Sequence, residues 1–319
     1  MCSAWLLYIF KSFQTIYCTT TGAFLMNVLS QLINDALNHQ GGHIRTDGNG
    51  DITQFIPVEP AAVRYLSMND VLTPKGGKQT TFNAVLAERS LVAQAGAEII
   101  RIPGPMTTPP TGNTGATTGR EVADRFVVVR PGAFAKVADG EEITMSGLPY
   151  LVSAFNHNNA PAYGVGYTLS RKQMKHDFAD DTTLEVVNTA IERGIADLAD
   201  FVLLNHLETA AETLASPSFT AVAQKIAAKN LRFDEVKAIV GGDCTGLELQ
   251  DGVLRAYGVR AEISGQTSST IIGAFGNAAV ALDDEIRVTA RRVLNGAVEI
   301  VVWVNASALV PDSTMFWKA

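Results

Sequence analysis

The sequence YTLSRKQMKHDFADDTTLEVVNTAIERGIADLADFVLLNHLET, residues 167–209, predicts a short strand, a turn and one long amphipathic helix. Apolar residues recur there in steps of three or four, which places them on one face of a helix. They are Leu184, Val187, Ile191, Ile195, Leu198 and Val202. The charged residues that fall off this stripe are Glu185, Glu192, Arg193 and Asp197. A helix over about 182–209 would be roughly 40 Å long, which suits a strut that crosses a domain.

The start of this helix carries a capping-box pattern, in which Thr182 and Glu185 are spaced T-x-x-E. The threonine hydroxyl can accept a hydrogen bond from a first-turn amide, while the glutamate reaches back to the cap amide. Asp180 and Asp181 put negative charge at the positive end of the helix dipole. Gly194 costs about 1 kcal/mol against alanine inside a helix. Two interpretations of it stay open: close approach of another backbone, or a glycine that is simply tolerated.

The composition is that of an ordinary globular protein. The 319 residues are 47% hydrophobic and 18% charged, and this length allows two or three subdomains. The formal net charge of −7 argues against a dedicated nucleic-acid binder, which usually has a basic face. The three cysteines, Cys2, Cys18 and Cys244, fit neither a zinc motif nor a disulfide framework. We therefore expect reduced thiols in a cytoplasmic product.

Residues 1–25 differ in their sequence pattern from the rest of the chain. The apolar run Ala4–Phe10 has no lysine or arginine before it, so it is poorly suited to a signal peptide, and it is too short to span a bilayer. Met26 then opens a conventional amphipathic segment, NVLSQLINDALN. Two interpretations stay open: Met26 is the true start and 1–25 is non-native upstream sequence, or 1–25 is a disordered N-terminal extension.

The elements expected along the rest of the chain alternate between helix and strand. We predict a short helix over 27–38, a loop-like extended arm over 40–60 and a second helix over 61–72. The segment 103–119, PGPMTTPPTGNTGATTG, is a low-complexity flexible loop. The run RFVVVR at 125–130 is typical of a strand.

Strand-like runs also lie on both sides of the turn-forming NHNNAP at 156–161. They predict a long two-stranded excursion over 132–168, folded about that turn, rather than a compact core. After the long helix, 217–240 has helical patterns and 253–310 alternates short strands with glycine turns. No internal repeat of fixed period is present in the sequence.

Two loop motifs begin in the sequence and are not completed. A calcium-type loop starting at Asp47 has Ile52 where it needs glycine and Val58 where it needs glutamate. A phosphate-type loop at 76–78, GGK, has Leu72 in the place of its first glycine. Both segments are better interpreted as solvated turns.

The histidines and cysteines predict no centre for chemistry. His39 and His43 are four apart, as helix-borne metal ligands can be, but two glycines between them argue against a helix. The other histidines have no partner at ligand spacing: His157, His176 and His206. Cys244 lies in the glycine-rich GGDCTG, where a small residue is more often tolerated than built into a nucleophile. We predict no catalytic residue, no cofactor, no metal site and no enzyme activity.

The order of elements over roughly 26–319 resembles the major capsid protein of tailed phages, the fold typified by phage Hong Kong 97. The sequence GAFAKVADGEEITMSGLPYLVSAFNHNNAPAYGVGYTLSRKQM is similar to the E-loop of that family. DDTTLEVVNTAIERGIADLADFVLLNHLET is similar to its spine helix. TSSTIIGAFGNAAVAL, the charged DDEIRVTARRV and a last long strand resemble its closing pattern.

The resemblance implies an α+β, Hong Kong 97-like capsid fold divided into seven segments. These are an N-terminal extension at 1–25, an N-terminal arm at 26–75, a peripheral-domain segment at 76–131 with a flexible loop at 103–119, an E-loop β-hairpin at 132–170, the peripheral domain with its long spine helix at 171–212, an axial domain at 213–285 and return strands of the peripheral domain at 286–319.

The resemblance also implies a function: a major capsid protein that self-assembles into hexamers and pentamers of an icosahedral virion shell around double-stranded DNA. Its expected partners are other copies of itself, a portal protein, a scaffold or maturation protease and decoration proteins. It would enclose DNA without sequence-specific binding, have no contact with a membrane, and be assembled in the host cytoplasm. The alternatives are an encapsulin-type nanocompartment shell protein, a soluble ligand-binding α/β protein or enzyme, and a phage tail-tube or minor structural protein.

Overall fold

The computed structural model describes residues 29, 32–33, 36, 43–46, 52–56, 62–68, 82–103, 125–132, 134, 136–140, 142–143, 145, 147–156, 159–176, 182–293 and 296–319. The fold is mixed α+β, and the chain divides into two compact units. The first contains Met1–Val85, Ala162–Ile195 and Asp284–Val304; the second contains Leu86–Pro161, Ala196–Asp283 and Asn305–Ala319. Three of the boundaries fall inside continuous elements: helix α2 (Phe82–Arg89), helix α5 (Thr182–Ala210) and strand β16 (Val298–Leu309).

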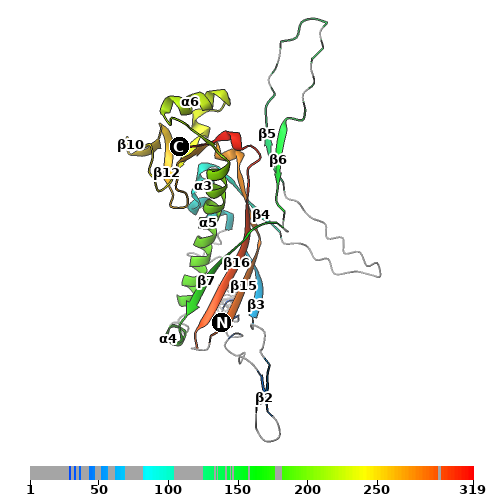
Figure 1. The fold of residues 1–319 in the computed structure, drawn as a ribbon, viewed down its shortest axis with the longest axis vertical. Helices are drawn as coiled ribbons and strands as arrows, with labels where there is room; N and C mark the ends of the chain where they lie inside the picture. Colours follow the sequence, from blue (N-terminus) through cyan, green and yellow to red (C-terminus); the bar gives the residue numbers. More distant parts are fainter. Residues whose placement is uncertain are drawn as a thin grey trace, which may run out of the picture. The chain divides into compact units, whose positions relative to one another are not determined.

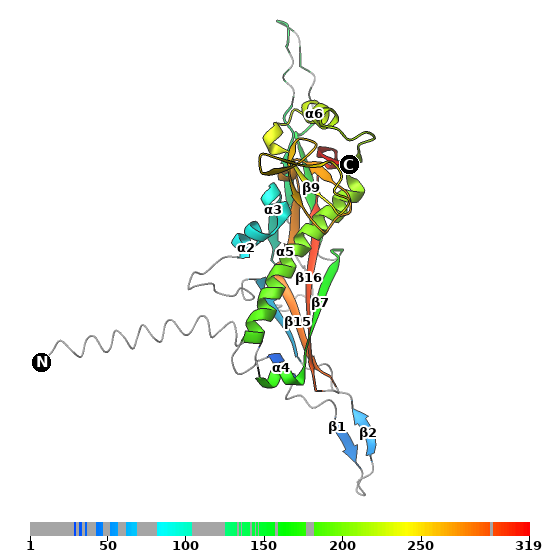
Figure 2. The same cartoon turned by 90° about the vertical axis from the view of Figure 1, so that its left-hand side faces the viewer.

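The first unit is built on a sheet in which β15 (Glu285–Arg292) pairs antiparallel with β16 on one side and with β3 (Ala62–Ser67) on the other. Strand β7 (Ala162–Leu169) also pairs with β16 (Figure 1). Burial alternates along β15, which is typical of a strand with one face on a core. The N-terminal half of α5 runs along this sheet (Figure 2). A short helix, α4 (Arg171–His176), joins β7 to the segment before α5.

Helix α5 begins at Thr182 and ends at Ala210, so the predicted helix over 182–209 is confirmed. Val187, Ile191, Ile195 and Val202 of the predicted stripe are buried. Glu192, which falls off the predicted stripe, is nevertheless only 2% exposed. It belongs to a second buried row, which contains Asn188, Glu192, Ala196, Ala199 and Leu203. Because Asn188 and Glu192 are polar, a search for apolar residues at helical spacing does not detect this row. The side chain of Thr182, and with it the capping box, lies outside the described residues.

Near the N-terminus, Leu29, Leu32, Ile33 and Ala36 are helical and buried, as the predicted helix over 27–38 requires. The loop-like arm predicted over 40–60 was wrong in part, because β1 (His43–Thr46) and β2 (Ile52–Ile56) form an antiparallel hairpin there.

The helix predicted over 61–72 was wrong as well, because β3 occupies this segment. The apolar spacing in AVRYLS fits a helical turn and a strand equally well, and six-residue pairing with β15 decides for the strand.

The second unit contains a sheet with the strand order β10-β11-β12-β9-β13-β17-β8. Its strands are β8 (Glu212–Thr213), β9 (Lys237–Val240), β10 (Leu247–Gln250), β11 (Val253–Ala256), β12 (Val259–Ile263), β13 (Ile271–Gly273) and β17 (Phe316–Lys318). Helix α6 (Phe219–Ala228) is capped by Ser218 and packs Val222 and Ile226 into a core with Trp317. Three short 3-10 turns complete this part: η2 (Phe233–Glu235), η3 (Phe275–Asn277) and η4 (Ser313–Met315).

The second unit also holds the end of α2 (Phe82–Arg89), whose first four residues belong to the first unit, together with α3 (Leu91–Ala95) and β4 (Glu98–Ile102). Strand β4 pairs in parallel with β14 (Ala279–Asp283), which pairs antiparallel with the end of β16. Strand β4 lies within the apolar run AEIIRI at 97–102. None of the helices in the described part of the chain has the length and apolarity needed to cross a membrane.

Gly194 lies on the exposed side of α5, and a Cβ atom added to it would meet no atom within 4 Å. Within the described chain the tolerated glycine is therefore the better interpretation. We expect Gly194→Ala to raise the free energy of unfolding by about 0.5–1 kcal/mol, because alanine has the higher helix propensity. Urea unfolding of the dissociated subunit measures this.

Gly164→Ala is the control for that measurement and should destabilise the protein, since its Cβ would lie 2.8 Å from Cε3 of Trp303. If Gly194→Ala lowered stability or blocked self-association, the other interpretation would hold, and a second backbone would pack against Gly194.

Candidate functional site

The most exposed apolar feature of the second unit is a hairpin and the excursion that it carries. Strands β5 (Arg125–Val129) and β6 (Tyr150–Ala154) pair antiparallel over five residues. The amide of Arg130 then donates to the carbonyl of Pro149 at 2.8 Å, and the chain between these residues forms the excursion (Figure 1). We call residues 131–148 the excursion below.

The strand RFVVVR is thus confirmed, but its partner was not predicted. The sequence suggested that two strands fold about NHNNAP at 156–161. That pairing was wrong: β6 pairs with β5, whereas β7 pairs with β16. Residues 156–161 connect two different sheets instead of closing a hairpin. The composition of NHNNAP is typical of a turn, but it does not determine which strands pair on either side of it. The partner of β7 is β16, which lies far away in the sequence.

The two faces of the hairpin differ sharply in burial. Phe126 and Val128 are 7% exposed and belong to a cluster of buried side chains that includes Phe155 and Leu309. On the opposite face, cross-strand pairs bring Val127 opposite Val152 and Val129 opposite Tyr150. These four side chains are exposed by 42% to 71%. One face therefore anchors the hairpin, and the other is an apolar strip open to solvent.

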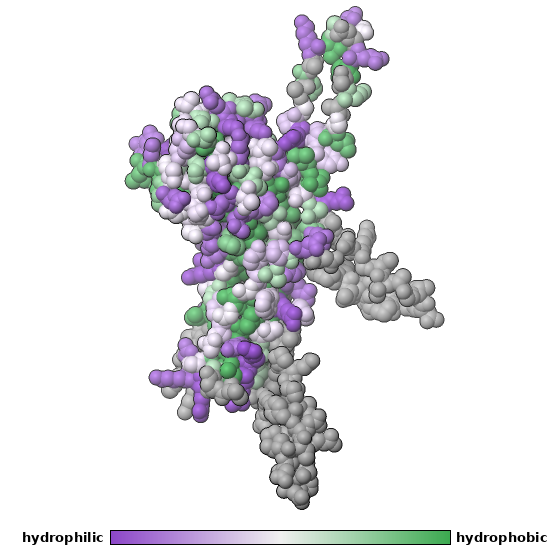
Figure 3. Space-filling model, viewed as in Figure 1, coloured by the Kyte–Doolittle hydropathy of each residue, from purple (hydrophilic) through white to green (hydrophobic). Residues whose placement is uncertain are grey.

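The excursion continues this apolar strip. Four of its large apolar side chains are exposed by more than half: Phe134 (105%), Met145 (91%), Leu148 (76%) and Ile143 (63%). Figure 3 shows hydrophobic residues along the hairpin and at its far end. A monomeric soluble protein rarely exposes a contiguous set of such residues, and a set of this kind marks an interaction surface.

A charge-assisted contact holds the root of the excursion. Arg130 donates from Nε to Oδ2 of Asp312 at 3.1 Å and from its Nη2 to the same oxygen. Asp312 is 4% exposed and also accepts from the amide and hydroxyl of Thr314. Burial alone would raise the pKa of this carboxyl, but the hydrogen bonds from Thr314 and Arg130 outweigh it and hold the pKa below its usual value. The strands at the root are thereby fixed, while the excursion extends from them.

A second buried carboxylate, Asp200 of α5, was missed by the sequence analysis. Its two oxygens accept from the Ser90 hydroxyl at 2.6 Å and from the amides of Leu91 and Val92 at 3.0 Å each. Burial is the main cause of a raised pKa for Asp200, against the hydrogen bonds that lower it. This carboxylate caps α3 from a helix more than a hundred residues away in sequence. No local pattern could have revealed it.

The residues tested for chemistry in the sequence lie on different elements where the structure describes them. Cys244 is exposed, with a φ of 49°, and His206 lies on the exposed side of α5. His43 begins β1 and His176 ends α4. Among the residues that the structure describes, no three His, Cys, Asp or Glu side chains gather closely enough to hold a metal ion. His39, His157 and the loop-motif residues Asp47, Val58, Leu72 and 76–78 lie outside the described residues, and Ile52 begins β2.

Comparison with known proteins gives similarity in structure only. No protein-family model matches the chain, and neither does any curated protein. Solved structures of phage capsids are among those that it resembles. The capsid of the native GTA particle has a TM-score of 0.45 and 12% identity, over 77% of this chain and 94% of that one. The satellite phage P4 procapsid has a TM-score of 0.44 and 12% identity, over 73% and 96%.

The virus-like particle from Pyrococcus furiosus is similar to the chain at a TM-score of 0.41 and 10% identity, over 74% of this chain and 97% of that one. Because all of these TM-scores lie below 0.5, we base the function on the geometry of the chain itself.

Proposed function

We propose that this chain is a capsid shell protein that self-assembles. The observation that carries the proposal is the apolar strip of the β5–β6 hairpin and its excursion, where Phe134 and Met145 are almost fully exposed. These side chains have no core of their own to enter, so burying them requires another polypeptide. Identical copies that exchange such a segment gain apolar contact at every subunit, which favours large, closed, symmetric assemblies.

At finer detail we propose a major capsid protein that forms hexamers and pentamers of an icosahedral virion shell around double-stranded DNA, assembled in the host cytoplasm. The elements fit the roles that the sequence resemblance implies. The β5–β6 hairpin with its excursion would be the E-loop, α5 the spine helix, and the seven-stranded sheet of the second unit the axial domain. The sheet of β3, β15 and β16 would belong to the peripheral domain.

The net charge of −7 supports a shell that encloses DNA without binding it tightly. A portal protein, a scaffold or maturation protease and decoration proteins remain proposed partners. The role is structural rather than enzymatic. An encapsulin-type nanocompartment shell is the second candidate, since an exchanged hairpin serves either container equally well.

Electron microscopy of the expressed protein tests the proposal. We expect closed particles of uniform size in negative stain, formed by the full chain or by a chain that begins at Met26. Nucleic acid inside particles purified from infected cells would favour the virion, whereas an enclosed enzyme would favour the nanocompartment. A chain that stays monomeric under all conditions, with or without a co-expressed scaffold, would contradict self-assembly.

A further inference from the structure

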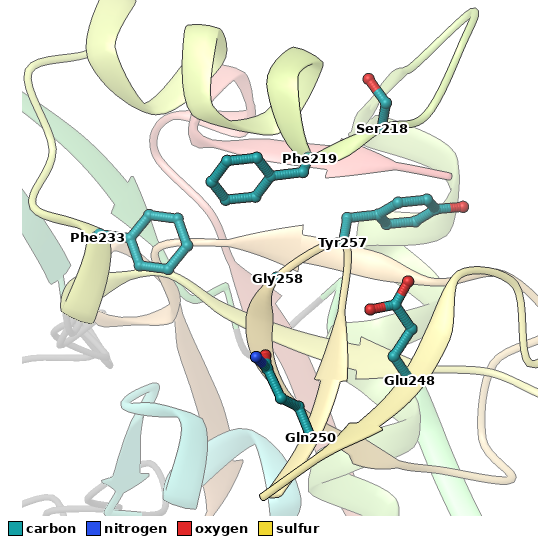
Figure 4. A pocket seen from close by; sticks show the side chains of 7 residues that line it. All are labelled: Ser218, Phe219, Phe233, Glu248, Gln250, Tyr257 and Gly258. Carbon is teal, nitrogen blue, oxygen red and sulfur yellow. The ribbon is translucent and has the colours of Figure 1, made fainter.

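An aromatic hollow of about 600 Å³ opens to solvent on the second unit, and the proposed function does not use it (Figure 4). Its wall comes from the start of α6, the turn η2, the strand β10 and the turn between β11 and β12. Strand β10 is the last strand of its sheet, so its outer edge has no neighbouring strand in the described structure. A polypeptide from outside can therefore reach the hollow along this edge.

Two aromatic rings stand open at the hollow. Phe219 is 57% exposed and Phe233 is 42% exposed, although their rings pack edge to face with centroids 6.2 Å apart. Figure 4 shows both rings turned toward each other at one side of the hollow, with Tyr257 close by. Rings held in this way present their faces and edges to a ligand instead of to a core.

The backbone around the hollow is shaped to hold these rings. Tyr257 and Gly258, with φ of 49° and 81°, form the two-residue turn between β11 and β12. The first position of such a turn favours Asn, Asp or Gly, and a bulky tyrosine there is strained. Strained residues of this kind gather at functional sites. The neighbouring turn between β10 and β11 uses the favoured pair, Asp251 and Gly252.

Two glycines make room for the rings. A Cβ atom on Gly258 would lie 2.6 Å from Cδ2 of Phe219, and one on Gly246 would lie 2.3 Å from Cζ of Tyr257. Both rings therefore lie directly on the backbone, and side chains at these positions would displace them.

The hollow also carries a carboxylate without a counter-ion. Glu248 of β10 is exposed, and its carboxylate has neither a hydrogen bond nor an ion pair with any residue that the structure describes. Arg255 stands opposite Glu248 in the strand register, yet its guanidinium donates to the carbonyl of Gly258 at 3.0 Å. Figure 4 shows the carboxylate of Glu248 extending toward Tyr257.

We propose that this hollow receives a lysine or arginine side chain from a second copy of this chain. Aromatic faces attract a cation through their quadrupoles, and an adjacent carboxylate supplies the matching charge. A guanidinium, being planar, can stack on a ring and pair with the carboxylate at once. The chain offers exposed cations that have no partner among the described residues: Lys136, Lys172 and Arg193. The choice of a second copy rests on the proposed self-assembly.

The first test is binding of a probe to the full-length subunit in its dissociated state, where no second copy fills the hollow, followed by NMR. The probe is N-acetyl-arginine amide, and its neutral counterpart is N-acetyl-citrulline amide. We expect the arginine probe to bind about tenfold more tightly than the citrulline probe. Glu248→Gln and Phe219→Leu should each weaken binding of the arginine probe about fivefold. Glu262 is an exposed acid on β12 beside Arg260, and Glu262→Gln should leave binding of this probe unchanged. Equal binding of the two probes, or binding unaffected by Glu248→Gln, would overturn the proposal.

The second test is assembly. We expect Glu248→Lys to reduce the assembled fraction about tenfold and Glu262→Lys to leave it unchanged, with both variants checked for folding by circular dichroism. If the wild-type protein forms particles and Glu248→Lys forms them equally well, a second copy does not fill the hollow, while the proposed shell function stands. If the wild-type protein forms no particles, the shell function fails, and the second-copy occupant fails with it.

Discussion

Replacing residues 131–148 with a two-residue Asn-Gly turn is expected to leave the subunit folded and to abolish its assembly. The replacement is feasible because the amide of Arg130 already donates to the carbonyl of Pro149, so these two residues lie close enough for a two-residue loop to join them. The subunit should lose little stability, since the large apolar side chains removed are exposed, Val137 by 37% and the others by 63% to 105%.

The assembly loses much more from the same replacement. Burying one Phe or Met side chain is worth about 1.5–3 kcal/mol, so the loss of only two at each interface lowers association by more than about a hundredfold. Urea unfolding and sedimentation velocity measure the two effects separately.

Point substitutions locate this effect within the excursion. Phe134→Ser with Met145→Ser should reproduce the loss of assembly, whereas Asp139→Asn with Glu142→Gln, which changes exposed polar residues of the same segment, should assemble like the wild type. Normal particles from the turn replacement would show that the excursion is not an interface. A replacement that fails to fold would instead show that the excursion supports the core of its own subunit.

The sequence predicted best where structure is determined locally. Helix α5 follows from one stripe of apolar residues, and the run at 125–130 was predicted as a strand from its β-branched residues alone. Both elements are long or strongly patterned, so neighbours along the chain decide their conformation.

Prediction failed where distant residues decide. The segment AVRYLS is a strand because β15 pairs with it. Strand β6 pairs with β5 and not with β7, although a turn-like sequence separates β6 from β7. Glu192 and Asp200 interrupt an apolar row with charge, so a pattern search excludes them from the buried side. The sequence predicted a two-stranded excursion over 132–168, which overlaps the β5–β6 hairpin and its excursion, but it did not predict that β5 and β6 are the paired strands. Exposed apolar side chains in a polar-looking loop become visible only when the fold shows that nothing covers them.

The buried carboxylate of Asp200 carries the largest predicted effect on stability. Asp200→Ala would leave three donors without an acceptor: the Ser90 hydroxyl and the amides of Leu91 and Val92. Ser90 is fully buried, so its hydroxyl cannot turn to water instead. A buried charged partner removed in this way costs about 3 kcal/mol or more. Urea unfolding of the dissociated subunit measures it. Asp197→Ala is the matched control: this exposed aspartate precedes Asp200 by one turn of the same helix and should shift stability by about 0.5 kcal/mol or less.

The pH dependence of stability shows whether burial or hydrogen bonding dominates the pKa of Asp200. Burial raises its pKa above the ordinary 3.8, so the folded protein binds this proton more tightly than the unfolded chain does. The stability that protonation contributes is therefore complete below about pH 3.8 and is lost as the pH rises through the folded-state pKa. Asp200→Asn has no proton to lose, and its misplaced amide donor imposes a cost that does not change with pH. The stability of the wild type relative to Asp200→Asn should thus fall as the pH rises through this window and then stay constant. A relative stability that instead increased with pH would mean that the three hydrogen bonds outweigh burial, and that the carboxylate is preferred in the folded state.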